Sequence, residues 1–222
     1  MEGRAATITG NRHTRGALDS GRARQSSLVK HALGLESGTV LVVPYDAAWP
    51  ALFATERTRI ENVLSSRGVS LAIEHTGSTA VEGLAAKPVL DILAGRTAGQ
   101  DRAEVIEALE AAGYQYRGEQ GIAGRDFFRR GEPRQYHLHL AQVDSEFWRE
   151  HRLFRDYLRT HPDVAGSYAS LKLELAARHP RDREAYIDGK TSFVRDVLEQ
   201  QKEHQLRRIV EIERRDADKE TP

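Results

Sequence analysis

Apolar residues in the first two-thirds of the chain alternate between the spacing of helices and that of strands. From just before Trp49 to Leu64 they recur on one broad face, which predicts an amphipathic helix that Gly68 ends. A second stretch with this spacing predicts a helix over 103–112. Short apolar runs bounded by turn residues predict strands over 40–44, 69–74, 87–94, 114–116, 124–130 and 136–143.

After Ser145 the pattern becomes helical throughout. Pro162 and Pro180 separate the helical segments, because proline lacks a backbone donor and disfavours a helix interior. The predicted helices cover 146–161, 164–178 and 183 to roughly 215. A mixed first half followed by a helical second half is typical of an α+β protein. We therefore expect a small mixed β-sheet flanked by helices, with a C-terminal helical subdomain.

Composition and periodicity divide the chain into three parts. Residues 1–38 are rich in Gly, Arg, Ser and Ala and have little periodicity, so we expect a disordered or loosely ordered tail. One domain is expected over 39–200, followed by a charged helical extension and tail over 201–222. Apolar residues in that last helix either pack on the domain or pair with another chain, which leaves the oligomeric state open.

Charge, hydropathy and cysteine content exclude several classes of protein. The 33 basic and 33 acidic residues cancel, so no overall field attracts nucleic acid or an anionic membrane. No apolar run approaches the ~18 residues of a membrane span. The chain has no cysteine, which excludes disulfides, zinc–thiolate sites and a thiol nucleophile. Its N-terminus lacks the apolar core of a secretion signal, so we expect a cytoplasmic protein.

The candidate chemistry begins with a Gly-Ser turn that follows an apolar segment. Gly77 lets the backbone approach a bulky anion, and Ser78 offers a hydroxyl to a phosphate oxygen or caps the next turn. The next apolar strand carries Asp91, a hard oxygen donor of the kind that Mg²⁺ prefers. A phosphate-approaching turn beside a metal-binding acid indicates nucleotide chemistry.

Further blocks accompany this turn, and together they resemble the GrpB family (UPF0157) from about Val40 to Leu198. Members of that family resemble the nucleotidyltransferase superfamily, which implies a nucleotidyltransferase-like core with a small mixed sheet. The blocks that carry the resemblance are Pro44-Tyr45-Asp46 with Trp49, Glu74 to Val81, Gly83 to Pro88 leading to Asp91-Ile92, Gly113-Tyr114, Arg125 to Phe128, His137 to Leu140, Phe154 to Arg159, Lys172 and Lys190.

The resemblance implies transfer of a nucleoside monophosphate from an NTP to a small acceptor, with Asp91 holding a divalent metal, Mg²⁺ or Mn²⁺. Superfamily enzymes usually supply two carboxylates two residues apart on one strand, but Leu93 stands at the second position here. His137 and His139 point to one face of their strand and are the candidates to complete the metal site. Alternatively, the protein binds a nucleotide or phosphorylated metabolite as a catalytically inactive accessory protein.

Four cationic residues are further candidates for contact with phosphate. Arg125 can grip phosphate through two parallel hydrogen bonds, or pair structurally with a neighbouring carboxylate. Lys172 and Lys190 resemble superfamily lysines that steady a triphosphate, although most helical lysines are only solvated. Lys87 either contacts phosphate or is a loop residue. The expected partner is therefore a nucleotide or phosphorylated small molecule; a purely structural role is the third alternative.

Overall fold

The computed structural model describes residues 33–219, so nearly all of the predicted tail over 1–38 lies outside the described residues. Five α-helices and five strands follow one another in the order expected from the sequence. The strands are β1 (Ala72–Thr76), β2 (Leu90–Arg96), β3 (Gln115–Tyr116), β4 (Asp126–Arg130) and β5 (Tyr136–Gln142). The helices are α1 (Trp49–Ser65), α2 (Arg102–Ala111), α3 (Glu146–Thr160), α4 (Pro162–Arg178) and α5 (Arg183–Lys219), with a short 3₁₀ turn, η1 (Ser78–Ala80).

The five strands form one mixed sheet in the order β1-β2-β5-β4-β3. Neighbouring strands run antiparallel except for β2 and β5, which are parallel. That parallel pair lies at the centre of the sheet and places Asp91 directly beside His137. The arrangement confirms the expected α+β class, a small mixed sheet flanked by helices.

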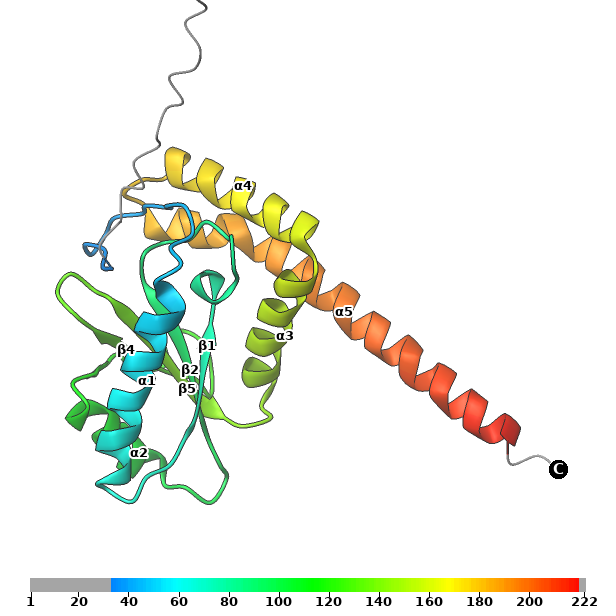
Figure 1. Ribbon diagram of the computed structural model, residues 1–222, viewed down its shortest axis with the longest axis horizontal. Helices are drawn as coiled ribbons and strands as arrows, with labels where there is room; N and C mark the ends of the chain where they lie inside the picture. The colour runs from blue at the N-terminus through cyan, green and yellow to red at the C-terminus, as the bar shows by residue number, and fades with distance from the viewer. Residues whose placement is uncertain (1–32, 220–222) are drawn as a thin grey trace, which may run out of the picture.

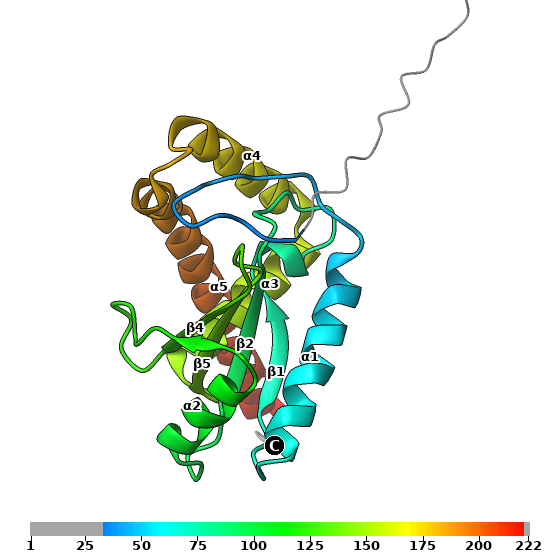
Figure 2. The same cartoon turned by 90° about the vertical axis from the view of Figure 1, so that its left-hand side faces the viewer.

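Helices α1 and α2 cover one face of the sheet. Their inward residues, among them Ile60 and Leu109, pack against Ile92 of β2 and Leu138 of β5 in the main apolar core. The opposite face meets α3, where the ring of Trp148 lies over Gly95 so closely that a Cβ there would sit 2.7 Å from it. Figure 2 shows α1 and α5 on opposite sides of the sheet.

The last two helices form the C-terminal helical part. Pro162 begins α4 instead of only interrupting the chain, because the first turn of a helix needs no proline N–H. Helix α5 packs beside α4 and then projects beyond the rest of the molecule, as Figure 1 shows. Within residues 33–219, no helix combines the length and apolar character that a membrane crossing requires.

The predicted edge strand over 40–44 is wrong in extent. Val43 forms an isolated antiparallel bridge with Ala86, with backbone hydrogen bonds of 2.9 Å in both directions. Pro44 follows at once and has no N–H with which to continue a ladder, so the pairing stops after one bridge. The bridge joins the segment before α1 to the loop that leads into β2.

Candidate functional site

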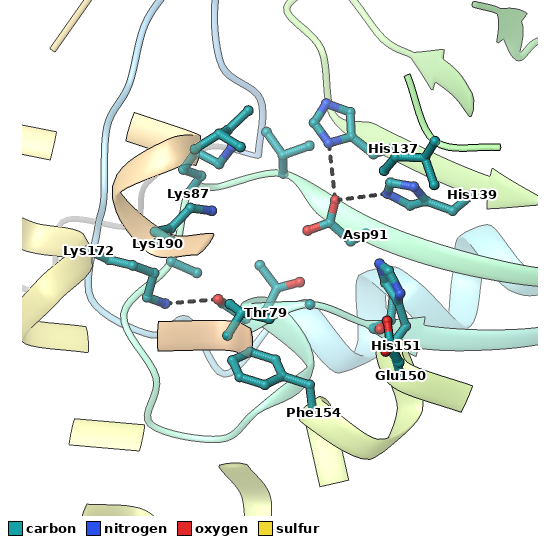
Figure 3. A pocket seen from close by; sticks show the side chains of 18 of the residues that line it. Thr79, Lys87, Asp91, His137, His139, Glu150, His151, Phe154, Lys172 and Lys190 are labelled. Carbon is teal, nitrogen blue, oxygen red and sulfur yellow. Dashed lines mark hydrogen bonds and ion pairs between the residues drawn. The ribbon is translucent and has the colours of Figure 1, made fainter. Parts of the chain in front are cut away.

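A cavity of about 480 Å³ lies where β1 ends and β2 and β5 begin, between the sheet and helices α3, α4 and α5. Figure 3 shows the lysines on one side of it and Asp91 with its histidines on the other. Every residue proposed from the sequence lines this cavity: Gly77, Ser78, Lys87, Asp91, Arg125, His137, His139, Lys172 and Lys190.

Sheet register brings Asp91 and the two histidines together. Asp91 pairs with His137 across the parallel β2–β5 contact, and strand alternation turns His139 to the same face. The Nδ1 atom of His137 lies 3.1 Å from Asp91 Oδ1, and the Nε2 atom of His139 lies 3.9 Å from the same oxygen. The three side chains thus converge at one point of the cavity wall (Figure 3).

This contact fixes the charge state of the Asp91 carboxyl group. Burial alone would raise its pKa, but the hydrogen bonds and charge of His137 and His139 outweigh burial and hold that pKa well below its usual range. Burial lowers the pKa of His137 to about 4. A neutral His137 imidazole therefore donates its Nδ1–H to an ionised Asp91 at neutral pH.

Asp91, His137 and His139 converge, but the described residues do not show a preformed site for a divalent metal. Leu93, two residues beyond Asp91, is fully buried and offers no ligand. Within the described part of the chain, no group of three or more His, Asp or Glu side chains is arranged to hold a metal ion. The nearest arrangement is the Asp91–histidine contact, which is already a hydrogen-bonded pair. The divalent metal stays a prediction.

The Gly-Ser turn packs directly on Asp91. Gly77 has a φ of +69°, and a Cβ at this position would lie 2.5 Å from Asp91 Oδ2. Only glycine combines that backbone conformation with so close an approach. The next residue, Ser78, is half-buried, and its hydroxyl accepts a hydrogen bond of 2.9 Å from Lys172 Nζ.

Three lysines from different elements meet at the other side of the cavity. Lys87 comes from the loop before β2 and Lys190 from α5, and both ammonium groups lie over the Tyr186 ring, at 5.4 Å and 4.7 Å from its centroid. Lys172 of α4 is 2% exposed and lies 4.7 Å from the centroid of the Tyr168 ring. Such contacts stabilise a cation that is removed from water.

Burial and the repulsion of neighbouring cations lower the pKa values of these three amines. Burial and the charge of Lys190 lower the pKa of Lys87 to about 7. Burial, with Lys190 and Lys87 nearby, lowers the pKa of Lys172 to about 7. Burial lowers the pKa of Lys190 to about 8, although Asp91 acts in the opposite direction. At neutral pH these amines are therefore divided between charged and neutral forms, and a bound anion would favour the charged forms.

Arg125 reaches the cavity but has backbone partners already. Its Nη2 donates to the carbonyl oxygens of Glu119 at 2.5 Å and Gln120 at 3.3 Å, and its guanidinium lies over Phe127. The alternative pairing with Asp126 does not form, because Asp126 is engaged by Arg102 at 2.5 Å. Arg125 retains a buried Nε without a partner in the described part of the chain.

Two basic residues that line the cavity escaped the sequence analysis. His151 lies one helical turn after Phe147, on the face of α3 turned to the cavity, and burial lowers its pKa to about 4. Its spacing from Phe147 and Phe154, which fit one inward helical stripe, is a signal that could have found it. Arg183 begins α5 and also lines the cavity, but its position after a proline-containing loop gave no comparable signal.

Comparison with known proteins places residues 39–200 on the family model described as GrpB protein. A crystal structure of conserved protein GrpB from Enterococcus faecalis matches with a TM-score of 0.62 and 34% identity, over 72% of this chain and 96% of that one. Glutamate-rich protein GrpB of Alkalihalophilus pseudofirmus is 33% identical over 172 residues, which is 75% of this chain and 98% of that protein.

Two further relatives are longer than the matched region. A UPF0157 protein of Pseudomonas aeruginosa is 46% identical over 165 residues, covering 71% of this chain and 65% of the relative. UPF0157 protein YqkA of Bacillus subtilis is 37% identical over 164 residues, covering 73% of this chain and 47% of the relative. The chain therefore spans about two-thirds and about half of the lengths of these two relatives.

Proposed function

The chain belongs to the GrpB family, and from that premise we propose that its cavity binds a phosphorylated small molecule, with nucleotides as the ligand class to test first. The proposal corresponds to the accessory, ligand-binding alternative expected from the sequence. It concerns the domain that contains the cavity, whose volume of about 480 Å³ lies within the range of small-molecule sites.

The observation that carries the proposal is the convergence of Lys87, Lys172 and Lys190. The chain has only six lysines among its 33 basic residues, and three of them line one cavity. Among the described residues, Lys202 pairs with Glu146 and Glu150, whereas none of the three cavity lysines has a carboxylate within ion-pair distance. An anion bound among these amines would favour their ammonium forms and offset the cost of burying that charge.

The remaining walls suit the rest of such a ligand. Phe127, Phe154 and Tyr168 bring aromatic surface to the same cavity, and the Tyr168 ring contacts Lys172. An aromatic wall offers a stacking surface to a base or another apolar group, while ammonium groups attract phosphate. A nucleotide combines these two parts in one molecule.

Nucleotidyl transfer is the second candidate, and the ionised Asp91 at the cavity wall favours it. A carboxylate held charged beside a Gly-Ser turn is the group that such chemistry uses to bring a metal to phosphate. Leu93 in the place of a second acid, and the direct contact of Asp91 with His137, weigh toward binding without turnover.

Isothermal titration calorimetry tests the proposal. Pyrophosphate and individual NTPs are each titrated in the presence of EDTA, of Mg²⁺ or of Mn²⁺. We expect the ligand to bind even when EDTA has removed divalent metal. Lys190→Met should weaken the affinity by roughly tenfold to a hundredfold, as expected for one lost charged hydrogen bond. Arg195→Met is the matched control because it removes one positive charge from the same helix at a side chain that is 62% exposed. Absence of binding by every phosphorylated probe, or equal weakening in both variants, would contradict the proposal; pyrophosphate release from an NTP would select transfer.

A further inference from the structure

One pair of cavity residues has a geometry that phosphate binding does not explain. Lys172 Nζ lies 2.9 Å from Ser78 Oγ and also donates to the carbonyl oxygen of Ala85. Both contacts come from residues far away in the sequence, on the turn after β1 and the loop before β2. The amine is thus directed at one hydroxyl and held there, instead of pointing freely into the cavity.

The surroundings of Lys172 favour its neutral form. Its side chain is 2% exposed, and the charged groups that face it are Lys190 of α5, Lys87 of the loop before β2, and Asp91 of β2. Burial and the two lysines lower the pKa of the amine to about 7, while Asp91 opposes them. A substantial share of neutral amine at neutral pH can accept a proton, which an ordinary lysine does not do.

Ser78 is placed to use such a base. Its hydroxyl belongs to a half-buried residue that lines the cavity, so a ligand can reach it. A serine hydroxyl is a weak nucleophile by itself and becomes reactive when an adjacent base takes its proton. Pairs of serine and lysine perform this role in several unrelated enzymes.

We propose that Ser78 is a nucleophile activated by Lys172, and that it attacks phosphorus in a phosphate ester or anhydride bound in this cavity. The inference rests on the proposed function for its substrate class. In the step, an Oγ lone pair of Ser78 forms the new bond to phosphorus, and the bond from phosphorus to the leaving oxygen breaks with its electron pair on that oxygen. The hydroxyl proton passes to Lys172 Nζ, and the resulting ammonium supplies a proton to the leaving oxygen.

Diisopropyl fluorophosphate tests this reactivity, because it presents an electrophilic phosphorus without needing a phosphate-binding site. Fluoride leaves as the bond to Ser78 Oγ forms, and peptide mass spectrometry locates the adduct. We expect labelling at Ser78 whose rate rises roughly tenfold between about pH 6 and pH 8 and then levels off, because the amine of Lys172 titrates at a pKa of about 7. A hydroxyl without a base would show a rate that keeps rising with pH.

Variants of Lys172 and Ser78 show whether Lys172 acts as a base or only forms a structural hydrogen bond. Lys172→Arg keeps a positive donor at this position but stays protonated, so labelling falls at least about a hundredfold while the fold is retained. Ser78→Ala abolishes the adduct, whereas Ser170→Ala leaves it unchanged, because Ser170 is exposed on α4 and bonds only to Gly166 O. Unchanged labelling in Lys172→Arg, or no adduct at Ser78 from pH 6 to 9, overturns the inference.

Titration with pyrophosphate distinguishes an error in the proposed nucleophile from an error in the proposed function. If pyrophosphate binds and Ser78 is not labelled, the nucleophile is wrong and the binding proposal stands. If Ser78 is labelled in the wild type but no phosphorylated probe binds, the phosphate site is wrong and the activated serine stands.

Discussion

At the residue scale, the cavity wall depends on a contact between a backbone and a carboxylate. Gly77 fits against Asp91 because it has no side chain, and His137 holds that carboxylate in place from the other side. The three residues come from β2, β5 and the turn after β1. Displacing any one of them moves the charge that faces the cavity.

Gly77→Ala is expected to reduce the free energy of unfolding by about 2–3 kcal/mol. The alanine would have to adopt a positive φ, and its Cβ would collide with Asp91. Gly83→Ala is the matched control, since Gly83 has a φ of +76° but nothing within 4 Å of the added atom. Gly83→Ala should reduce the free energy of unfolding by about 1–2 kcal/mol, because of the backbone conformation alone. Urea denaturation measures both, and equal losses would show that the Asp91 contact contributes nothing.

At the element scale, Arg155 fastens α3 to the edge of the sheet. Its Nη1 donates to Glu74 Oε2 at 2.7 Å and to the carbonyl oxygen of His75 at 2.9 Å, while its other nitrogens pair with Asp156. The side chain is 8% exposed. Because α3 also carries His151 and Phe154, this attachment positions part of the cavity wall.

Arg155→Met should lower the free energy of unfolding by roughly 2–3 kcal/mol, since it leaves Glu74 and a buried carbonyl short of a donor. Arg178→Met removes a comparable ion pair with Glu174, but both of those side chains are 61% exposed. We expect that control to change stability by less than about 0.5 kcal/mol in the same denaturation experiment. A large effect at Arg178, or none at Arg155, would contradict this account.

The crossing of α4 and α5 predicts opposite effects for two helical glycines. At Gly189 an added Cβ would lie 2.5 Å from Leu175, so Gly189→Ala should destabilise by about 1–3 kcal/mol through overpacking. Gly166 of α4 has nothing within 4 Å, and Gly166→Ala should stabilise by up to about 1 kcal/mol through helix propensity. Thermal unfolding of the two variants checks the signs, and a stabilising Gly189→Ala would show that the helices separate easily.

Individual elements were predictable from the sequence, but their pairing was not. The spacing of Ile60 and Leu64, and the alternation around Leu138, are local signals that predict α1 and β5 to within a few residues. Parallel pairing of β2 with β5 depends on contacts across the whole domain, which no local pattern encodes. For the same reason the sequence could nominate Lys172 as a phosphate ligand but could not reveal its hydrogen bond with Ser78.

At the scale of the whole molecule, a chain with no net charge gathers three lysines and two arginines around one cavity. Among the side chains that the structure describes, Lys202 forms ion pairs with Glu146 and Glu150, whereas the three cavity lysines have no carboxylate within ion-pair distance. Among the side chains described in α5, Val197 is the last buried one. We propose that the domain ends near residue 200 and that the remainder of α5 is an extension.

Anion affinity should fall as the pH rises from about 6.5 to 9. Lys87 and Lys190, with pKa values of about 7 and 8, lose their charge over this range, and an anion binds the charged forms better. Sulfate is the suitable probe because its own charge is constant there, and titration calorimetry should show at least about a tenfold weakening. Lys87→Arg stays charged and should flatten the dependence; an affinity independent of pH in the wild type would contradict the lowered pKa values.

The parallel contact between β2 and β5 also bears on how the protein is made. Asp91 leaves the ribosome 46 residues before His137, so a nascent chain that ends ahead of β5 carries the acid on a hairpin with β1 and has no imidazole to hold it. Closing so long a loop is entropically unfavourable and tends to come late in folding. Because the cavity also needs Lys172 of α4 and Lys190 of α5, we expect ligand capture to begin only after synthesis has passed Lys190, and shorter translation products to bind no anion.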